Sequence, residues 1–218
     1  SIGLQNPGVD VFIKDELPFL KKYNIKIIAN IAGSTIEEYC ELADILSDTA
    51  TDAIELNVSC PNVNEGCIAF GNTAKGISII TKRVKKSSAK PIIVKLTPNV
   101  ADIKEIAKAA ESSGADAISL INTITGMAID IHKKRPILAN NFGGLSGPAI
   151  KPIALKMTYD VANTVKIPVI GMGGISSGND AIEFMLAGAK AVMVGTWNFS
   201  NPKACIDIIE GITDYLMM

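Results

Sequence analysis

The sequence predicts an α/β fold of the TIM (β/α)8-barrel type, with about six of the eight strand–helix units present in these 218 residues. Three observations support this prediction. Short apolar runs alternate with segments of helical periodicity, several runs end in polar residues, and glycine-rich turns follow the last two runs. Alternation of this kind is typical of a parallel sheet covered by helices.

The predicted strands are six runs rich in Ile, Val and Ala, at 26–30, 53–57, 91–95, 117–122, 168–171 and 191–195. Continuous apolar runs are typical of buried parallel strands. A doubly wound sheet is the alternative, but polar strand ends favour a barrel, where such ends meet at one mouth. A whole barrel has about 250 residues, so two further units, roughly 60 to 80 residues, are expected before Ser1.

Helices are predicted between the strands. A capping box at Ser34 and Glu37 predicts the start of one helix. Two others are predicted to end at Gly114 and Gly188, because glycine readily adopts the left-handed conformation found after a helix. The apolar faces follow from residues spaced three and four apart: Ile36, Tyr39, Ala43 and Leu46; Ile103, Ile106, Ala107 and Ala110; Ile182 and Met185. The stretch 123–147 shows neither helical nor strand periodicity and is predicted to be a functional loop over the barrel mouth.

Composition argues against several classes of partner. The formal net charge is −1, so no global field attracts nucleic acid or an anionic membrane. No apolar run reaches the roughly 18 residues of a membrane span, and the first twenty residues do not resemble a signal peptide. We therefore expect one cytoplasmic domain, residues 1–218, that binds a small molecule.

The four cysteines form no C-x-x-C pair, and the chain has one histidine, so no metal site is predicted. Cys40 and Cys205 are interpreted as helix-packing residues and Cys67 as a small loop residue. His132 is predicted to lie in a solvated loop without a catalytic role.

Cys60 is the candidate catalytic base. It follows a predicted strand, and Pro61 prevents the strand from continuing. A thiol, whose unperturbed pKa is about 8.5, accepts a proton near neutral pH where its surroundings favour the thiolate. Removal of a proton next to a carbonyl needs such a group within reach. The alternative interpretation is a small buried apolar residue.

Glycine-rich turns predict a phosphate site. Gly171-Met-Gly-Gly-Ile175 and Val194-Gly-Thr196 come after the last two predicted strands, where this fold commonly binds phosphate. Glycine lets backbone N–H groups approach an anion, and a following helix N-terminus adds favourable partial charge. The alternative is that these glycines only permit tight turns.

Polar residues at strand ends suggest a flat heterocyclic ligand. Asn30, Asn57 and Asn122 offer both donors and acceptors, which suit the edge of a flavin or a pyrimidine. Lys95 is placed to stabilise negative charge on a reduced flavin ring. The alternative interpretation of any one of these residues is an ordinary polar position at the rim of the barrel.

Six motifs together closely resemble class 1 dihydroorotate dehydrogenases over essentially the whole chain: Ile2-Gly-Leu-Gln-Asn-Pro-Gly8, Asn57-Val-Ser-Cys-Pro-Asn62, Ile121-Asn-Thr123, Gly143-Gly-Leu-Ser-Gly-Pro148, Gly171-Met-Gly-Gly174 and Val194-Gly-Thr196. The membrane-associated class 2 enzymes carry serine at the position of Cys60. Residues 5–8 and 143–152 resemble the B-type, NAD-linked catalytic subunit. Cys67 departs from the family pattern, in which glycine is more common.

This resemblance implies oxidation of (S)-dihydroorotate to orotate in UMP biosynthesis, with FMN as the bound cofactor. Electrons would pass to a partner subunit that carries FAD and a [2Fe–2S] cluster, and then to NAD. The catalytic subunit would form a homodimer core within a heterotetramer.

The resemblance also assigns roles to residues. Cys60 would take the C5 proton while C6 delivers hydride to N5 of FMN. The implied substrate contacts are Ile2, Gly3, Leu4, Asn57, Asn62, Asn122 and Thr123. The implied cofactor contacts are Asn30, Asn57, Lys95, Ile121, Gly147, Gly173, Gly174, Gly195 and Thr196.

Two other functions stay open at this point. A flavin barrel of the dihydropyrimidine dehydrogenase type would act on uracil or thymine and would not need to bind the orotate carboxylate. A non-catalytic barrel that binds a phosphorylated ligand would show no flavin spectrum.

Overall fold

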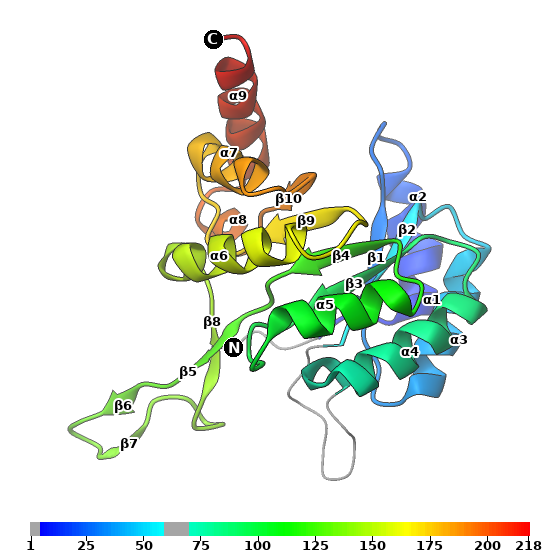
Figure 1. Ribbon diagram of the computed structural model, residues 1–218, viewed down its shortest axis with the longest axis horizontal. Helices are drawn as coiled ribbons and strands as arrows, with labels where there is room; N and C mark the ends of the chain where they lie inside the picture. The colour runs from blue at the N-terminus through cyan, green and yellow to red at the C-terminus, as the bar shows by residue number, and fades with distance from the viewer. Residues whose placement is uncertain (1–4, 59–69) are drawn as a thin grey trace. The chain divides into compact units, whose positions relative to one another are not determined.

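The computed structural model describes residues 5–58 and 70–218, which form two compact units (Figure 1). The first unit contains the residues up to 96 together with 105–118, and the second contains 97–104 and 119–218. Strand β4 (Ala117–Leu120) begins in the first unit and ends in the second.

The first unit holds the strands β1 (Ile28–Ile31), β2 (Ala53–Asn57) and β3 (Ile92–Leu96), which neighbour one another and β4 in that order. Its helices are α1 (Val9–Val11), the π-helix Phe12–Glu16, α2 (Leu17–Leu20), α3 (Ile36–Ser47), the 3-10 helix Phe70–Asn72, α4 (Ala74–Ser87) and most of α5 (Ile103–Ser112). β1 pairs with β2 and β2 with β3, both in parallel.

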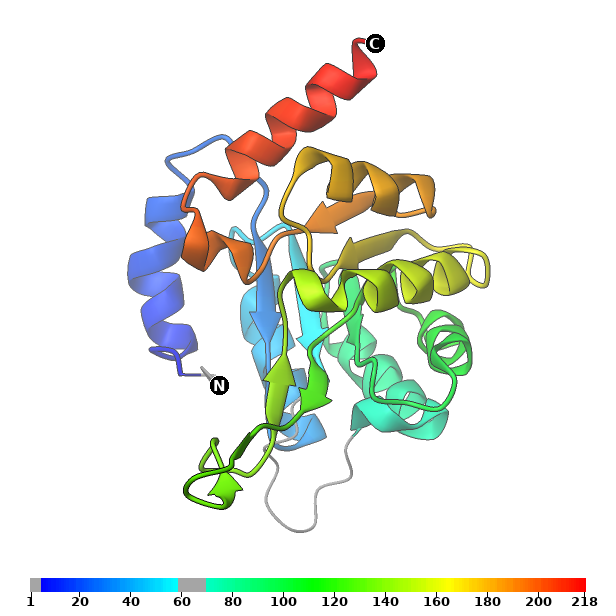
Figure 2. The same cartoon turned by 90° about the vertical axis from the view of Figure 1, so that its left-hand side faces the viewer.

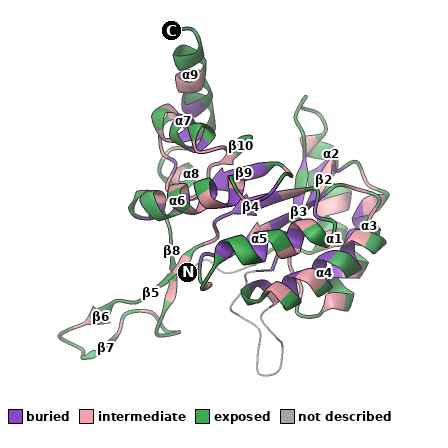
Figure 3. Cartoon of the chain, viewed as in Figure 1, coloured by how far each residue is buried: buried purple, intermediate pink, exposed green. Residues whose placement is uncertain are grey.

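The core of the first unit lies between these strands and their helices. Helix α3 packs against β1, β2 and α4, and strand residues such as Ile54, Leu56 and Val94 are fully buried (Figure 3). Each such side chain contributes about 1.5–3 kcal/mol of burial free energy. Because side chains alternate along a strand, the intervening residues share the opposite face, and these include Asn30, which is exposed.

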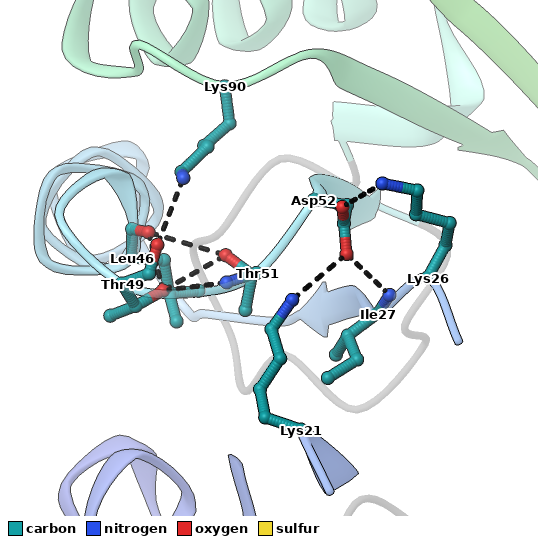
Figure 4. A network of polar contacts seen from close by, with 8 residues as sticks. All are labelled: Lys21, Lys26, Ile27, Leu46, Thr49, Thr51, Asp52 and Lys90. Atoms are coloured by element: carbon teal, nitrogen blue, oxygen red, sulfur yellow. Dashed lines mark hydrogen bonds and ion pairs between the residues drawn. The ribbon is translucent and has the colours of Figure 1, made fainter. Parts of the chain in front are cut away.

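The amino-terminal ends of β1 and β2 are joined through Asp52 (Figure 4). Its carboxylate accepts hydrogen bonds from Ile27 N and Lys26 Nζ, both at 2.9 Å, and Lys21 Nζ lies 3.5 Å away. The Ile27 N–H and then the Lys26 ammonium hold the pKa of Asp52 at about 2. The Asp52 cluster therefore stabilises the amino-terminal ends of β1 and β2, whereas Asn57 lies at the carboxyl end of β2.

The second unit holds the end of β4 followed in strand order by β9 (Val169–Met172) and β10 (Ala191–Met193), which pair in parallel. Its other elements are β5 (Ile124–Gly126), β6 (Ile129–Asp130), β7 (Arg135–Pro136), β8 (Gly143–Leu145), the 3-10 helix Pro148–Ile150, α6 (Lys151–Ala162), α7 (Gly178–Leu186), α8 (Trp197–Ser200) and α9 (Ala204–Leu216). α6 packs against β9 and α7, and α7 against β10 and α9.

The prediction of an irregular loop at 123–147 is wrong. β5 pairs with β8 and β6 pairs with β7, both antiparallel, so this stretch forms a two-stranded ribbon. The ribbon extends away from β9 and β10 of its own unit (Figures 1 and 2). Its strands have two or three residues each, which is too short for an alternating apolar pattern to be recognised. His132 is exposed between β6 and β7, as predicted.

The six parallel strands predicted from the sequence are all found; β2 has the predicted bounds, and the bounds of the other strands shift by at most two residues. Asn30 and Lys95 therefore lie one residue before the ends of β1 and β3, and Asn122 and Gly195 lie two residues after β4 and β10. Strand termini depend on pairing with a neighbour, which composition does not reveal.

The helix termini are predicted with one error. Gly114 and Gly188 follow α5 and α7 with positive φ angles of 98° and 109°, as expected. The N-cap of α3 is Thr35 rather than Ser34, since the Thr35 side chain accepts from Glu38 N at 3.2 Å. A Glu three residues after Thr35 fits the capping-box spacing equally well.

Two apolar assignments are also wrong. Met185 is 40% exposed on α7, and Cys205 is exposed on α9, with Sγ 3.6 Å from Asn198 Oδ1. Cys40 is half-buried on α3, in agreement with a packing role. None of the helices in residues 5–58 and 70–218 combines the length and hydropathy that a transmembrane helix requires.

Candidate active site

In the first unit, three predicted cofactor contacts occupy one face of neighbouring strands. Asn57 ends β2 and lies directly opposite Lys95 on β3, while Asn30 of β1 lies opposite Glu55 of β2. Paired residues of parallel strands project to the same face. Asn57 is 7% exposed and Lys95 is half-buried. The face thus presents two amides and one cation, which can bond to the polar edge of a flat heterocycle.

Glu55 belongs to this face, although no role was predicted for it. It is 4% exposed, and its Oε2 accepts a hydrogen bond from Asn30 Nδ2. That bond fixes which end of the Asn30 amide points toward Glu55. A carboxylate within an apolar strand, two residues before Asn57, was the available signal, because buried charges are rare without partners.

Tyr39 fixes the carboxyl end of β2. Its hydroxyl donates to the backbone oxygen of Asn57 at 2.7 Å, and the ring is 2% exposed. In the sequence, Tyr39 stands out only as an apolar position of a helix. The hydrogen bond holds the backbone immediately before the segment that contains Cys60.

The predicted base Cys60 and the predicted substrate contacts Ile2, Gly3, Leu4 and Asn62 lie outside the described residues, as does Cys67. Their roles stay predictions.

In the second unit, three glycine-containing turns come together. A Cβ added to Gly174, which has a φ of 76°, would lie 2.8 Å from both Gly147 O and Lys151 N. A Cβ on Gly147 would lie 3.8 Å from Thr196 Cγ2, and Thr196 Oγ1 donates to Ser146 Oγ at 2.8 Å. The turns after β8, β9 and β10 are therefore adjacent.

Ile121 and Gly173 extend the same cluster. Ile121 N donates to Met172 O at 2.9 Å, and a Cβ on Gly173 would lie 2.7 Å from Ala154 Cβ and 3.4 Å from Ile121 Cγ1. By contrast, among residues 5–58 and 70–218 no atom outside the chain neighbours of Gly195 lies within 4 Å of a Cβ placed on it. The backbone at Gly195 thus borders open space, which fits the approach of a phosphate group.

Asn122 and Thr123 are tightly held in the same unit. Thr123 N donates to Asn122 Oδ1 at 2.8 Å. A Cβ on Gly144 of β8 would lie 2.6 Å from Thr123 Cβ, so only glycine leaves room for the threonine side chain. The ribbon therefore shapes the surroundings of Thr123.

A polar cluster supports the turn after β9. Lys151 Nζ lies 2.7 Å from Asp180 Oδ1 and 3.0 Å from Glu183 Oε2, and Asp180 Oδ2 accepts from both Ser176 N and Ser176 Oγ at 2.9 Å. Burial raises the pKa of Asp180, but these hydrogen bonds outweigh it and bring the pKa down to about 2. Hydrogen bonds to Asp180 and then Glu183 raise the pKa of Lys151. Sequence patterns gave no sign of this cluster.

Asp180→Asn is expected to lower the free energy of unfolding at pH 7 by roughly 2 kcal/mol. Because the folded-state pKa of Asp180 lies below its ordinary value of 3.8, its contribution is present above about pH 4 and is lost as the pH falls toward 2. Urea unfolding at pH 7 and at lower pH measures the difference. Glu37→Gln is the control, since the Glu37–Arg83 pair is exposed and is worth at most about 1 kcal/mol. A pH-independent deficit would contradict this explanation.

The described residues contain no group of three His, Cys, Asp or Glu side chains that could hold a metal ion. The donors that are present, amides, one lysine and glycine backbone, suit an organic cofactor with a phosphate group. FMN is such a group, and the residues described fit it.

The chain matches the family model described as dihydroorotate dehydrogenase over residues 1–216. It is 62% identical over 216 residues to "Dihydroorotate dehydrogenase B (NAD(+)), catalytic subunit" of Alkaliphilus metalliredigens, covering 99% of this chain and 72% of that protein. It is 60% identical over 218 residues to the protein of the same name from Thermoanaerobacter pseudethanolicus, covering 100% and 72%.

The matched family has the (β/α)8-barrel fold, so the predicted fold class is confirmed by the match and by the six parallel strands with their helices. Both the family model and these relatives align with nearly the whole chain. From these matches, we conclude that the chain belongs to the dihydroorotate dehydrogenase family.

Proposed function

We propose that this chain is the catalytic subunit of an NAD-linked dihydroorotate dehydrogenase, which oxidises (S)-dihydroorotate to orotate in UMP biosynthesis. The observation that carries the proposal is the 62% identity over 216 residues to a protein of that name. The arrangement of the described residues supports it, because each unit presents donors of the kinds that a flavin and a pyrimidine need.

The substrate loses one proton and one hydride in this reaction. Cys60 takes the proton from C5 as general base. FMN, when bound, supplies the acceptor for the hydride from C6. Asn57, Asn122 and Thr123 orient the pyrimidine ring, together with Asn62 and the segment formed by Ile2, Gly3 and Leu4.

The proposed cofactor contacts form two sets. Asn30, Asn57 and Lys95 bond the polar edge of the isoalloxazine ring, where the Lys95 ammonium stabilises negative charge. Ile121 packs on the cofactor. The phosphate and ribityl end is held by Gly147, Gly173, Gly174, Gly195 and Thr196.

The electrons leave this chain through a partner subunit. A second subunit that carries FAD and a [2Fe–2S] cluster takes the electrons and passes them to NAD, and two copies of each subunit form a heterotetramer around a homodimer of this chain. We also propose that residues 1–218 belong to a single barrel domain and that the enzyme works in the cytoplasm.

Anaerobic mixing of the FMN-loaded enzyme with dihydroorotate tests the reaction. We expect rapid bleaching of the oxidised flavin absorbance, because the hydride reduces the flavin. Bleaching by NADPH or a dihydropyrimidine, with none by dihydroorotate, would favour the dihydropyrimidine dehydrogenase type. A protein without a flavin spectrum would favour a non-catalytic barrel.

Gly195→Ala tests the phosphate assignment. Since no described residue other than its chain neighbours has an atom within 4 Å of the added Cβ, the thermal stability of the FMN-free protein should stay unchanged. The affinity for FMN should fall by about tenfold or more, because the methyl group keeps the phosphate from the backbone. Fluorescence titration with FMN gives the affinity, and a value equal to that of the wild type would remove Gly195 from the site.

A further inference from the structure

Asn99, in the turn between β3 and α5, holds the backbone that follows Asn122. Its Nδ2 donates to Thr123 O at 3.0 Å, and its Oδ1 accepts from Thr125 N at 3.0 Å. Thr123 O can only accept and Thr125 N can only donate, so the orientation of the Asn99 amide is settled. The side chain thus imitates the hydrogen bonding of an antiparallel strand along residues 123–125.

Thr97 holds the Asn99 amide in place. Asn99 N and Asn99 Nδ2 both lie 3.2 Å from Thr97 Oγ1, and Thr97 is 3% exposed. Both Nδ2 hydrogens and the Oδ1 atom of Asn99 are therefore engaged. A side chain oriented in this way loses little additional entropy when it binds the neighbouring backbone.

On its other side, Thr123 meets the ribbon. A Cβ on Gly144 would lie 2.6 Å from Thr123 Cβ, so the threonine side chain is packed closely on β8. Thr123 N is also bonded to Asn122 Oδ1 at 2.8 Å. Asn99 and Gly144 therefore constrain the Thr123 backbone and side chain from two separate segments of the second unit.

We propose that Asn99 is a positioning residue for the substrate: through Thr123 O and Thr125 N it fixes the segment 122–125, so that Asn122 and Thr123 meet the pyrimidine ring in one geometry. The inference rests on the proposed function, since it takes Asn122 and Thr123 as substrate contacts. Asn99 itself is not a catalytic residue, because its amide is occupied by Thr97 and the backbone. Asn99 therefore influences the affinity for substrate rather than the rate of proton or hydride transfer.

The test compares Asn99→Ala and Asn99→Asp in the FMN-loaded enzyme. Asn99→Ala removes both contacts to the segment, whereas Asn99→Asp keeps the acceptor for Thr125 N but faces Thr123 O with a second acceptor. Asn99 is exposed, so water can replace the lost contacts and both variants should fold. The matched control is Asn163→Ala, which removes another exposed amide that donates to a backbone oxygen, Tyr159 O at 2.8 Å.

The dissociation constant for orotate, measured from the change in flavin absorbance, should rise about tenfold in both Asn99 variants, since two hydrogen bonds that order the segment are lost or opposed. KM for dihydroorotate should rise in parallel, while kcat, FMN affinity and thermal stability stay close to those of wild type and of Asn163→Ala. A merely structural role would lower FMN affinity and thermal stability as well.

Orotate binding within twofold of wild type in both variants would overturn the inference, as would an equal loss of FMN and orotate affinity. A wild-type enzyme that binds FMN but neither binds orotate nor is reduced by dihydroorotate would refute the proposed function instead. The two failures are distinguished by the wild-type measurement alone.

Discussion

Cys60→Ser is expected to slow reduction of the bound flavin by dihydroorotate by roughly 10²–10⁴-fold, the usual contribution of a general base. Serine keeps the approximate size of the side chain but ionises at a much higher pH than a thiol, whose unperturbed pKa is about 8.5. Orotate keeps one C5 hydrogen, but this hydrogen is vinylic and is not transferred to the base, so orotate binding should change by less than about threefold, within a typical single hydrogen-bond contribution. The effect should therefore fall on the chemical step.

Stopped-flow absorbance under anaerobic conditions measures the reduction rate. Cys205→Ser is the matched control, because Cys205 is exposed on α9 and has no assigned role in the reaction. Reduction by the wild type should accelerate as the pH rises through the pKa of the Cys60 thiol. Unchanged reduction in Cys60→Ser would exclude Cys60 as the base.

Gly174→Ala is expected to destabilise the protein by more than about 2 kcal/mol and to abolish FMN binding. A residue with a side chain pays about 1–2 kcal/mol in the left-handed region, and Gly174 has a φ of 76°. The added Cβ would also lie 2.8 Å from Gly147 O and Lys151 N. These are backbone atoms, so the turns after β8 and β9 would have to separate.

Gly114→Ala separates the effect of backbone strain from the effect of the close contacts of the added Cβ. Gly114 has a φ of 98°, but of the residues that the structure describes, its added Cβ would meet only the flexible Lys85 side chain, at 3.4 Å. This variant should lose about 1 kcal/mol through backbone strain and should keep its affinity for FMN. Urea unfolding gives both stabilities and fluorescence titration gives the FMN affinity. Equal losses in the two variants would show that the contact of Gly174 with Gly147 and Lys151 is unimportant.

Much of the candidate site could be predicted because certain residue types are unusual where they occur. Amides and a lysine near the ends of apolar strands are costly unless they bind something, and this drew attention to Asn57 and Lys95. Glycines such as Gly174 marked turns that a side chain would disrupt. Both inferences depend on residues close together in the sequence.

The missed residues depend on contacts between distant parts of the chain. Glu55 is unusual within an apolar strand, but its partner is revealed only once β1 places Asn30 beside it. Asn99 looks like an ordinary turn residue until Thr123 and Thr125 lie within hydrogen-bond distance. Lys151 and Asp180 are likewise joined only when α6 packs against α7. No periodicity or local motif records such partners.

The sequence by itself determined the alternation of six parallel strands with helices, the glycine-rich turns and the residue types that a flavin and a pyrimidine need, because hydrophobic periodicity and turn chemistry are local properties. Tertiary structure alone decided the ribbon formed by β5 to β8, the strand ends and the pairing of Asn99 with residues 123–125. These features are fixed by hydrogen bonds between separate segments of the chain, and these bonds form only when the chain folds.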